Sequence, residues 1–180
     1  MTTINKQNID LNTQSVLSMR SAGYYSQKTV GAKIAIDSTL SLLKNALNEI
    51  PKLSFLRMAD FGSADGGTSQ EMWFKLIEEI KKNNDNRQIE ILFTDLPSND
   101  FSTLFKIMQG MLGNSKLSFQ NKYSDIFVHG CGTGFHQQLI SDNSLSLGFS
   151  ATAMHYLSKK PCQIVDHVHM TGANNDEKEK

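Results

Sequence analysis

The stretch Ala59-Asp60-Phe61-Gly62-Ser63-Ala64-Asp65-Gly66-Gly67-Thr68-Ser69 decides the fold of this 180-residue chain. It ends a short apolar run at residues 55–62, which is typical of a buried strand, and it leads into a segment at 69–82 whose apolar residues have helical spacing. A glycine-rich turn that joins a strand to a helix is characteristic of a βαβ unit. The stretch therefore predicts an α/β fold.

The same alternation of strand and helix continues on both sides of this turn. A first helix is predicted at 31–50, closed by Pro51 and with apolar residues at Ile34, Leu40, Leu43 and Leu47. The later segments predict, in order, a strand at 89–97, a helix at 101–112, a strand at 125–130 and a strand at 144–151. We expect a mostly parallel, Rossmann-like sheet with about half of the strands of a complete one, so that it is incomplete at its C-terminus.

Composition limits the cellular setting and the partners. We expect a flexible N-terminal tail at 1–15, one domain at 16–170 and a polar tail at 171–180. The net charge is zero without a basic cluster, which argues against nucleic acid or an anionic membrane as a partner. Without a signal-peptide pattern or a long apolar run, a cytoplasmic protein is expected. Cys131 and Cys162 are too few and too far apart for a disulfide framework.

The turn has the chemistry of a cofactor loop. Its spacing is Asp-x-Gly-x-Ala-x-Gly, so Ala64 stands where a dinucleotide-binding loop has the glycine that admits a pyrophosphate. S-adenosylmethionine has no phosphate, and Asp60 can accept its positively charged amino group. The alternative is a tight turn that binds nothing. An NAD-dependent oxidoreductase is a further alternative, which Ala64 disfavours.

Two more positions point to an adenosine-type ligand. Asp95 ends the next predicted strand, where an acidic residue can accept hydrogen bonds from both ribose hydroxyls. The alternative is a turn residue before Pro97. The third turn, at 130–135, contains Gly134 and Phe135; Phe135 is either an adenine-stacking residue or an anchor to the core.

Four segments together resemble the SABATH methyltransferases, which methylate carboxyl groups of small acids or ring nitrogens of purine alkaloids. They are MRSAGYYSQKT, ADFGSADGGTS, FTDLPSNDFSTLFK and GFSATAMHYLS, in the family's order from about Met19 to Met170. The most specific is LPSNDFSTLF, close to the family's Leu-Pro-Gly-Asn-Asp-Phe-Asn-x-Ile-Phe. The chain is thus similar to the N-terminal part of a bacterial-type relative of this family. The family's members are about twice as long as this chain. A fragment that only binds cofactor or a partner is the alternative to an active enzyme.

The resemblance implies roles for individual residues. For S-adenosylmethionine it implies that Tyr25 and Thr29 close over the cofactor and that Asp60, Gly62, Ser63 and Thr68 contact it from the loop. It also implies that Asp95 and Leu96 hold the ribose and pack on the adenine, with Gly134 and Phe135 beside the adenine. For the acceptor it implies Ala32, His155 and Tyr156. Ala32 stands in place of a carboxylate-gripping Gln and Tyr156 in place of a Trp, while Thr68 and Gly134 replace an Asn and a Ser.

The expected reaction is a direct methyl transfer to a small-molecule acceptor, most simply the carboxyl group of an organic acid. An ionised carboxylate needs no general base, whereas a neutral nitrogen or hydroxyl does, and His155 is then the candidate. The structural alternative for His155 is a polar residue on a helix turn. His167 and His169 are two residues apart, so on a strand both would point to the same face, where they could bind a metal. No third ligand is evident in the sequence, so we expect no metal. A homodimer is a further possibility.

Overall fold

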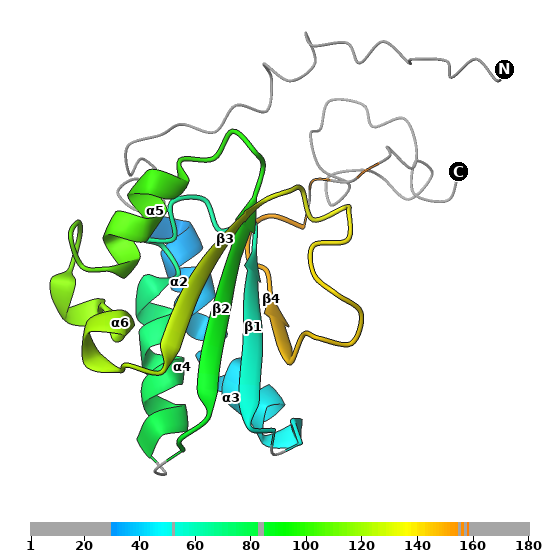
Figure 1. The fold of residues 1–180 in the computed structure, drawn as a ribbon. Coiled ribbons are helices and arrows are strands. Elements are labelled where there is room, and N and C mark those ends of the chain that lie inside the picture. Colours follow the sequence, from blue (N-terminus) through cyan, green and yellow to red (C-terminus); the bar gives the residue numbers. More distant parts are fainter. Residues whose placement is uncertain (1–29, 52, 83–84, 155, 157, 159–180) are drawn as a thin grey trace, which may run out of the picture.

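The chain forms a four-stranded parallel sheet, as the sequence predicts. The computed structural model describes residues 30–51, 53–82, 85–154, 156 and 158. Its strands are β1 (Phe55–Phe61), β2 (Gln88–Asp95), β3 (Ile126–Gly132) and β4 (Leu147–Phe149). They lie in the order β3-β2-β1-β4, and each neighbouring pair is parallel (Figure 1). The carboxyl ends of all four strands therefore lie at one edge of the sheet, where ligands bind in open α/β sheets.

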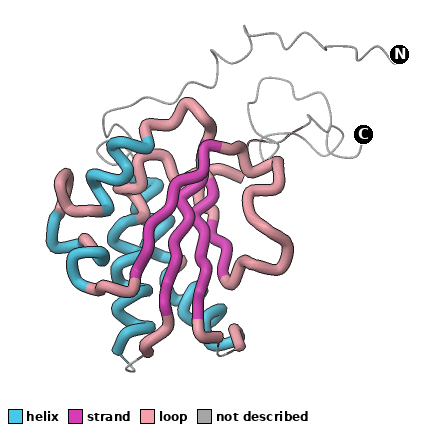
Figure 2. Tube along the Cα trace, viewed as in Figure 1, coloured by secondary structure: helices cyan, strands magenta, loops and turns pink. Residues whose placement is uncertain are grey.

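The described helices gather on one face of the sheet (Figures 1 and 2). They are α2 (Val30–Ser38), α3 (Leu40–Glu49), α4 (Gln70–Lys82), α5 (Phe101–Met108), the 3-10 helix η2 (Ser115–Leu117) and α6 (Phe119–Lys122). Helix α4 is the crossover between β1 and β2. Within the described part of the chain, no helix is both long and apolar enough to cross a membrane.

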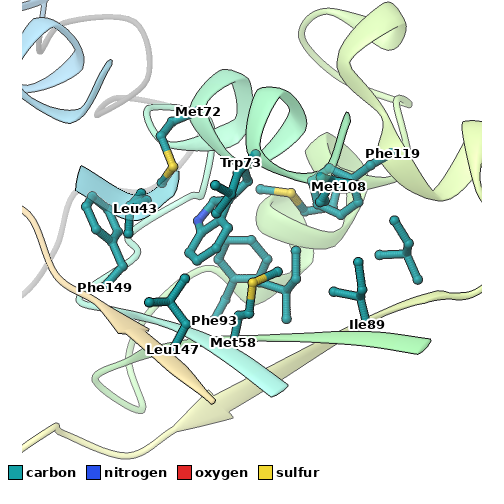
Figure 3. Packing of buried hydrophobic residues seen from close by; sticks show 14 of the residues in the cluster. Leu43, Met58, Met72, Trp73, Ile89, Phe93, Met108, Phe119, Leu147 and Phe149 are labelled. Carbon is teal, nitrogen blue, oxygen red and sulfur yellow. The ribbon is translucent and has the colours of Figure 1, made fainter. Parts of the chain in front are cut away.

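The hydrophobic core lies between α4 and the face of the sheet that the helices cover. Alternate residues of β1 and β2 point toward the helices because side chains of a strand alternate between its faces. Figure 3 shows Trp73 of α4 in the middle of the core, above Met58 and Phe93 of the sheet. The Trp73 ring meets the Phe149 ring of β4 edge-on, with centroids 5.9 Å apart. The glycine-rich turn is thus joined to a helix that the core holds rigidly.

The predicted helix at 31–50 is two helices, and this part of the prediction is wrong. The break falls at Thr39, whose hydroxyl donates to the Ile36 carbonyl, while the Ser38 hydroxyl donates to the Ala35 carbonyl. Adjacent hydroxyl side chains that bond to the backbone compete with helix hydrogen bonds. The break changes the buried face: Ile36 is in the core, and Ile34 is 65% exposed.

Other boundaries also differ from the prediction: β4 covers only Leu147–Phe149 of the strand predicted at 144–151, and β2 ends at Asp95 instead of Pro97. Helix α5 ends at Met108 because Gly110 adopts a left-handed φ of 73°, and Leu112 is consequently exposed. Strand β3 continues to Gly132, so the glycines at its end are partly in the strand. The short helices of 115–122 were not predicted, and the side chains of Asn114 and Ser118 cap them.

Candidate functional site

The β1–α4 turn is fastened to the end of β2 by backbone hydrogen bonds. The N–H groups of Gly62 and Ser63 both donate to the Thr94 carbonyl, at 2.9 and 3.1 Å. Gly62 has a φ of 78°, and a Cβ atom there would lie 2.4 Å from the Cβ of Ala153. A glycine is therefore required at this position by both backbone conformation and packing. These contacts bring the carboxyl ends of β1 and β2 into one site.

Asp95 fixes the middle of the turn. Its Oδ2 accepts a hydrogen bond from the Ala64 N–H at 2.7 Å, and its Oδ1 accepts one from the Leu96 N–H at 2.7 Å. Asn99 binds the other side of the same residue, since its Nδ2 donates to the Ala64 carbonyl at 2.8 Å. Ala64 is held in a left-handed conformation, with φ of 50°. The turn is thus held in its conformation by two side chains, one from the last residue of β2 and one from the segment that follows it.

Asp60 ends β1 as a buried carboxylate, with 3% of its surface exposed. Its Oδ2 accepts two hydrogen bonds, from the Ser69 hydroxyl at 2.7 Å and from Trp73 Nε1 at 2.9 Å. No described residue donates to its Oδ1. The carboxylate therefore has one oxygen held by the protein and one that no described side chain engages.

The two carboxylates lie in an environment that disfavours their charge. Burial raises the pKa of Asp60 to about 6, with a smaller contribution from the charge of Asp95, although the hydrogen bonds from Trp73 and Ser69 lower it. Burial also raises the pKa of Asp95, against the two backbone N–H donors. No described Lys, Arg or His forms an ion pair with either residue. A cationic group of a ligand would be attracted to this edge.

The structure also brings the third turn to this site. A Cβ atom on Gly62 would lie 3.8 Å from the Phe135 ring, and one on Gly134 would lie 3.6 Å from the Leu96 side chain. Phe135 is partly buried, and its ring lies 4.8 Å from that of His136. Leu96, Gly134 and Phe135 therefore surround the same strand ends as Asp60 and Asp95, as an adenine-packing role requires.

For the remaining predicted residues that it describes, the structure gives a position in the chain and an exposure. Ser63 is buried, its hydroxyl 3.4 Å from the Thr94 carbonyl, and Thr68 is partly exposed just before α4. Ala32 is partly exposed on α2, and Tyr156 is 54% exposed beyond Ala153. Tyr25, Thr29, His155, His167 and His169 lie outside the described residues. Among the residues that the structure does describe, no group of three metal-binding side chains is found.

Three residues of the site were not predicted from the sequence. Trp73 was covered only by the helical pattern predicted at 69–82, and Ser69 and Asn99 were given no role. Asn99 stands inside the motif LPSNDFSTLF, which was the available signal. No pattern in the sequence indicates that the indole N–H of Trp73 points at Asp60.

The chemistry of the site fits a ligand that has a cation and vicinal hydroxyls. Carboxylates accept hydrogen bonds from both kinds of group. A pyrophosphate would meet two acidic side chains, and the Ala64 N–H that would approach it is already donated to Asp95. The geometry therefore disfavours a dinucleotide, in agreement with the expectation from Ala64.

Comparisons with known proteins agree with this chemistry. The family model described as SAM dependent carboxyl methyltransferase, where SAM is S-adenosylmethionine, matches residues 18–178. Methyltransferase FUS9 of Gibberella moniliformis is 34% identical over 149 residues, which cover 79% of this chain and 39% of that protein. The salicylate/benzoate carboxyl methyltransferase of Arabidopsis thaliana is 35% identical over 113 residues, covering 60% of this chain and 29% of the relative.

A solved structure shares the fold. It is titled loganic acid methyltransferase with SAH, and it superposes with a TM-score of 0.62 at 23% identity over 80% of this chain and 41% of its own. The present chain thus spans well under half the length of the relatives it matches. Their remaining length lies outside the aligned region.

Proposed function

This chain belongs to the family of S-adenosylmethionine-dependent carboxyl methyltransferases, and from that premise we propose that it binds S-adenosylmethionine at the carboxyl edge of β1 and β2. The methyl acceptor is a small molecule, most simply the carboxyl group of an organic acid. The observation that supports the cofactor site is the pair of buried carboxylates, Asp60 and Asp95, at the ends of adjacent parallel strands without a described cation beside them.

Each carboxylate has its own part of the cofactor. Asp60 accepts the ammonium of the methionine portion, and Asp95 accepts the ribose hydroxyls while it holds the turn through Ala64. Leu96 and Phe135 pack against the adenine, with Gly134 beside them. Further contacts come from the loop residues Gly62, Ser63 and Thr68, and from Tyr25 and Thr29 closing over the ligand.

The protein's task in the reaction is to position the reactants and exclude water. S-adenosylmethionine supplies, when bound, a methyl group on a positively charged sulfur. The chain need not supply a nucleophile, and an ionised carboxylate acceptor has no proton to lose, so no general base is needed. For a neutral nitrogen or hydroxyl acceptor, His155 is the proposed base. Ala32 and Tyr156 are the proposed neighbours of the acceptor, and Tyr156 can donate its hydroxyl to a carboxylate.

The proposed setting is the cytoplasm. The zero net charge and the lack of a basic cluster support a small-molecule partner and not a nucleic acid or a membrane. A homodimer is the proposed assembly. Sedimentation of the purified chain at two concentrations tests the assembly independently of the cofactor.

The test of the cofactor site is a calorimetric titration of the 180-residue chain with S-adenosylhomocysteine, with NAD as the comparison ligand. We expect S-adenosylhomocysteine to bind and NAD not to bind, because the turn has no free backbone donor at Ala64 for a phosphate. The control variant is Glu49→Gln, which removes an exposed carboxylate at the end of α3 and leaves the affinity unchanged. Binding of NAD alone, or of neither ligand by a folded chain, would contradict the proposal.

A further inference from the structure

Trp73 is the single tryptophan of the chain, and it does more than fill the core. Its ring is wholly buried, and its indole N–H donates to Oδ2 of Asp60 at 2.9 Å. The Ser69 hydroxyl donates to the same oxygen at 2.7 Å. Both donors engage one oxygen of the carboxylate, and no described residue donates to the other.

The two donors come from one turn of helix. Ser69 stands immediately before α4 and Trp73 one turn later, and the Trp73 N–H bonds to the Ser69 carbonyl at 3.0 Å. Residues four apart lie on the same face of a helix, so both side chains point at the end of β1. Phe149 packs edge-on against the Trp73 ring and restricts its rotation. The donors are thus fixed by the core and not by the ligand.

A buried carboxylate is unexpected at this position if its side chain has only a packing role. A buried carboxylate is unfavourable unless it is paired with a cation, and an apolar residue would pack without that penalty. The two neutral donors offset the burial only in part, since the pKa of Asp60 remains raised. A fixed carboxylate with one oxygen that no described residue engages can accept the cationic group of a ligand.

We propose that Trp73 and Ser69 are positioning residues for the cofactor: they hold Asp60 through Oδ2 and so present Oδ1 to the ammonium of the methionine portion. This inference rests on the proposed function and assigns a role to α4 within it. Neither side chain needs to touch the cofactor. Their effect is to fix the direction of the carboxylate and to favour its ionised form.

The groups around Asp60 allow this role to be tested by pH. Asp95, at the end of β2, is the charged neighbour that raises its pKa. Helix α4 contributes Trp73, and the residue before it is Ser69; neither side chain titrates near neutral pH. Strand β4 contributes the apolar Phe149. Trp73 has no hydrogen bond to Asp95. A variant of Trp73 that moves the pH dependence of binding therefore acts through Asp60.

The experiment measures the affinity for S-adenosylhomocysteine between pH 5.5 and 8 for the full chain, Trp73→Phe and Ser69→Ala. Loss of one donor to the carboxylate should move the midpoint of the pH-dependent loss of binding upward by about one unit. At pH 6.5 the affinity should fall by about tenfold, partly from protonation and partly from misplacement of the carboxylate. Ser69→Ala keeps the test available if Trp73→Phe does not fold.

The matched control is Phe119→Leu, a wholly buried core residue of α6 that does not contact Asp60. It should lower the stability and leave the midpoint unchanged. Trp73→Phe and Ser69→Ala variants that bind with the unchanged affinity and midpoint would overturn the inference while leaving the cofactor site in place. A folded chain that binds no S-adenosylhomocysteine at any pH would overturn the proposed function and this inference with it.

Discussion

The two edges of the sheet treat charged side chains in opposite ways. At the amino edge, below the strands in Figure 1, the partly buried Lys81 and Arg87 each have a partner of opposite sign. Lys81, with its side chain 8% exposed, pairs with Asp125 and also donates to the carbonyls of Asp85 and Arg87 at 3.1 and 2.8 Å. Arg87 pairs with Asp85 through both carboxylate oxygens. These charges are satisfied within the protein.

At the carboxyl edge, the described residues that donate hydrogen bonds to Asp60 and Asp95 are all neutral. The pKa of each is raised by burial, whereas the Arg87 side chain lowers the pKa of Asp85. The same fold therefore has a neutralised edge, where charges of opposite sign pair, and a second edge, where no described cation pairs with the two carboxylates. The difference supports the proposal that the carboxyl edge binds a cationic ligand, at a cost in stability.

Asp95→Ala should give the largest effect on binding. It removes the acceptor of the ribose hydroxyls and releases the Ala64 and Leu96 N–H groups. Two charge-assisted hydrogen bonds are worth roughly a hundredfold in affinity for S-adenosylhomocysteine, which calorimetry can measure. An affinity within threefold of the unmodified chain would remove the distinction between the two edges.

Asp125→Ala tests the neutralised edge. It leaves the Lys81 ammonium in a mostly buried site with only carbonyl partners, and we expect the free energy of unfolding to fall by about 2 kcal/mol in urea denaturation. The affinity for S-adenosylhomocysteine should stay within twofold because the cofactor is proposed to bind at the opposite edge. A parallel loss of affinity would show that the two edges are not independent.

Asp60→Asn should weaken binding and stabilise the fold. In the folded chain the pKa of Asp60 is about 6 instead of 3.8, so the folded state binds this proton more tightly than the unfolded state. The charge therefore lowers stability above pH 6 and has no such effect below pH 3.8. The variant should gain about 2 kcal/mol at pH 7.5 in urea denaturation, with a smaller gain at pH 5.

Asp85→Asn should show the opposite dependence on pH. Arg87 lowers the pKa of Asp85 in the folded chain, so this carboxylate stabilises the fold at neutral pH and loses that effect as the pH falls through the lowered value. The variant should be less stable at pH 7.5, and the difference should vanish in strong acid. Slopes of the same sign for the Asp60 and Asp85 variants would contradict the comparison of the two edges.

Asn99→Ala should have the smallest effect. It removes the hydrogen bond to the Ala64 carbonyl, and Asp95 still holds the N–H on the other side of that residue. A single neutral hydrogen bond corresponds to about a fivefold loss of affinity for S-adenosylhomocysteine. Calorimetry at pH 7.5 measures this, with Asn114→Ala as a control that removes an exposed cap far from the turn.

The sequence predicted the parallel α/β fold and the order of its main elements, because the apolar spacing of β1, β2 and α4 is strong and local. It did not predict the break at Thr39, where two hydroxyl side chains take backbone carbonyls that a continuous helix would use. It also missed the short helices of 115–122, which have a weak apolar pattern and are stabilised by capping side chains. These features depend on side-chain hydrogen bonds and not on hydrophobic periodicity.

The same limit applies to the candidate site. Asp60 and Asp95 were predicted from their positions at strand ends, and the structure brings both to one edge; their contacts with a cofactor stay predictions. The direction of the Trp73 indole depends on how α4 packs over β1, which no local pattern encodes. Similarly, the clamp of Asn99 on Ala64 joins residues 35 positions apart.

The most direct test of the proposed cofactor site locates the ligand on the chain. In amide proton–nitrogen NMR spectra, addition of S-adenosylhomocysteine should shift the signals of Gly62, Ala64, Leu96 and Gly134 most. The amide of Ile89, at the amino edge, should stay in place, since it bonds to the Asp125 carbonyl away from the proposed site. Shifts concentrated around Ile89, or none at a saturating concentration, would contradict a cofactor site at the carboxyl ends of β1 and β2.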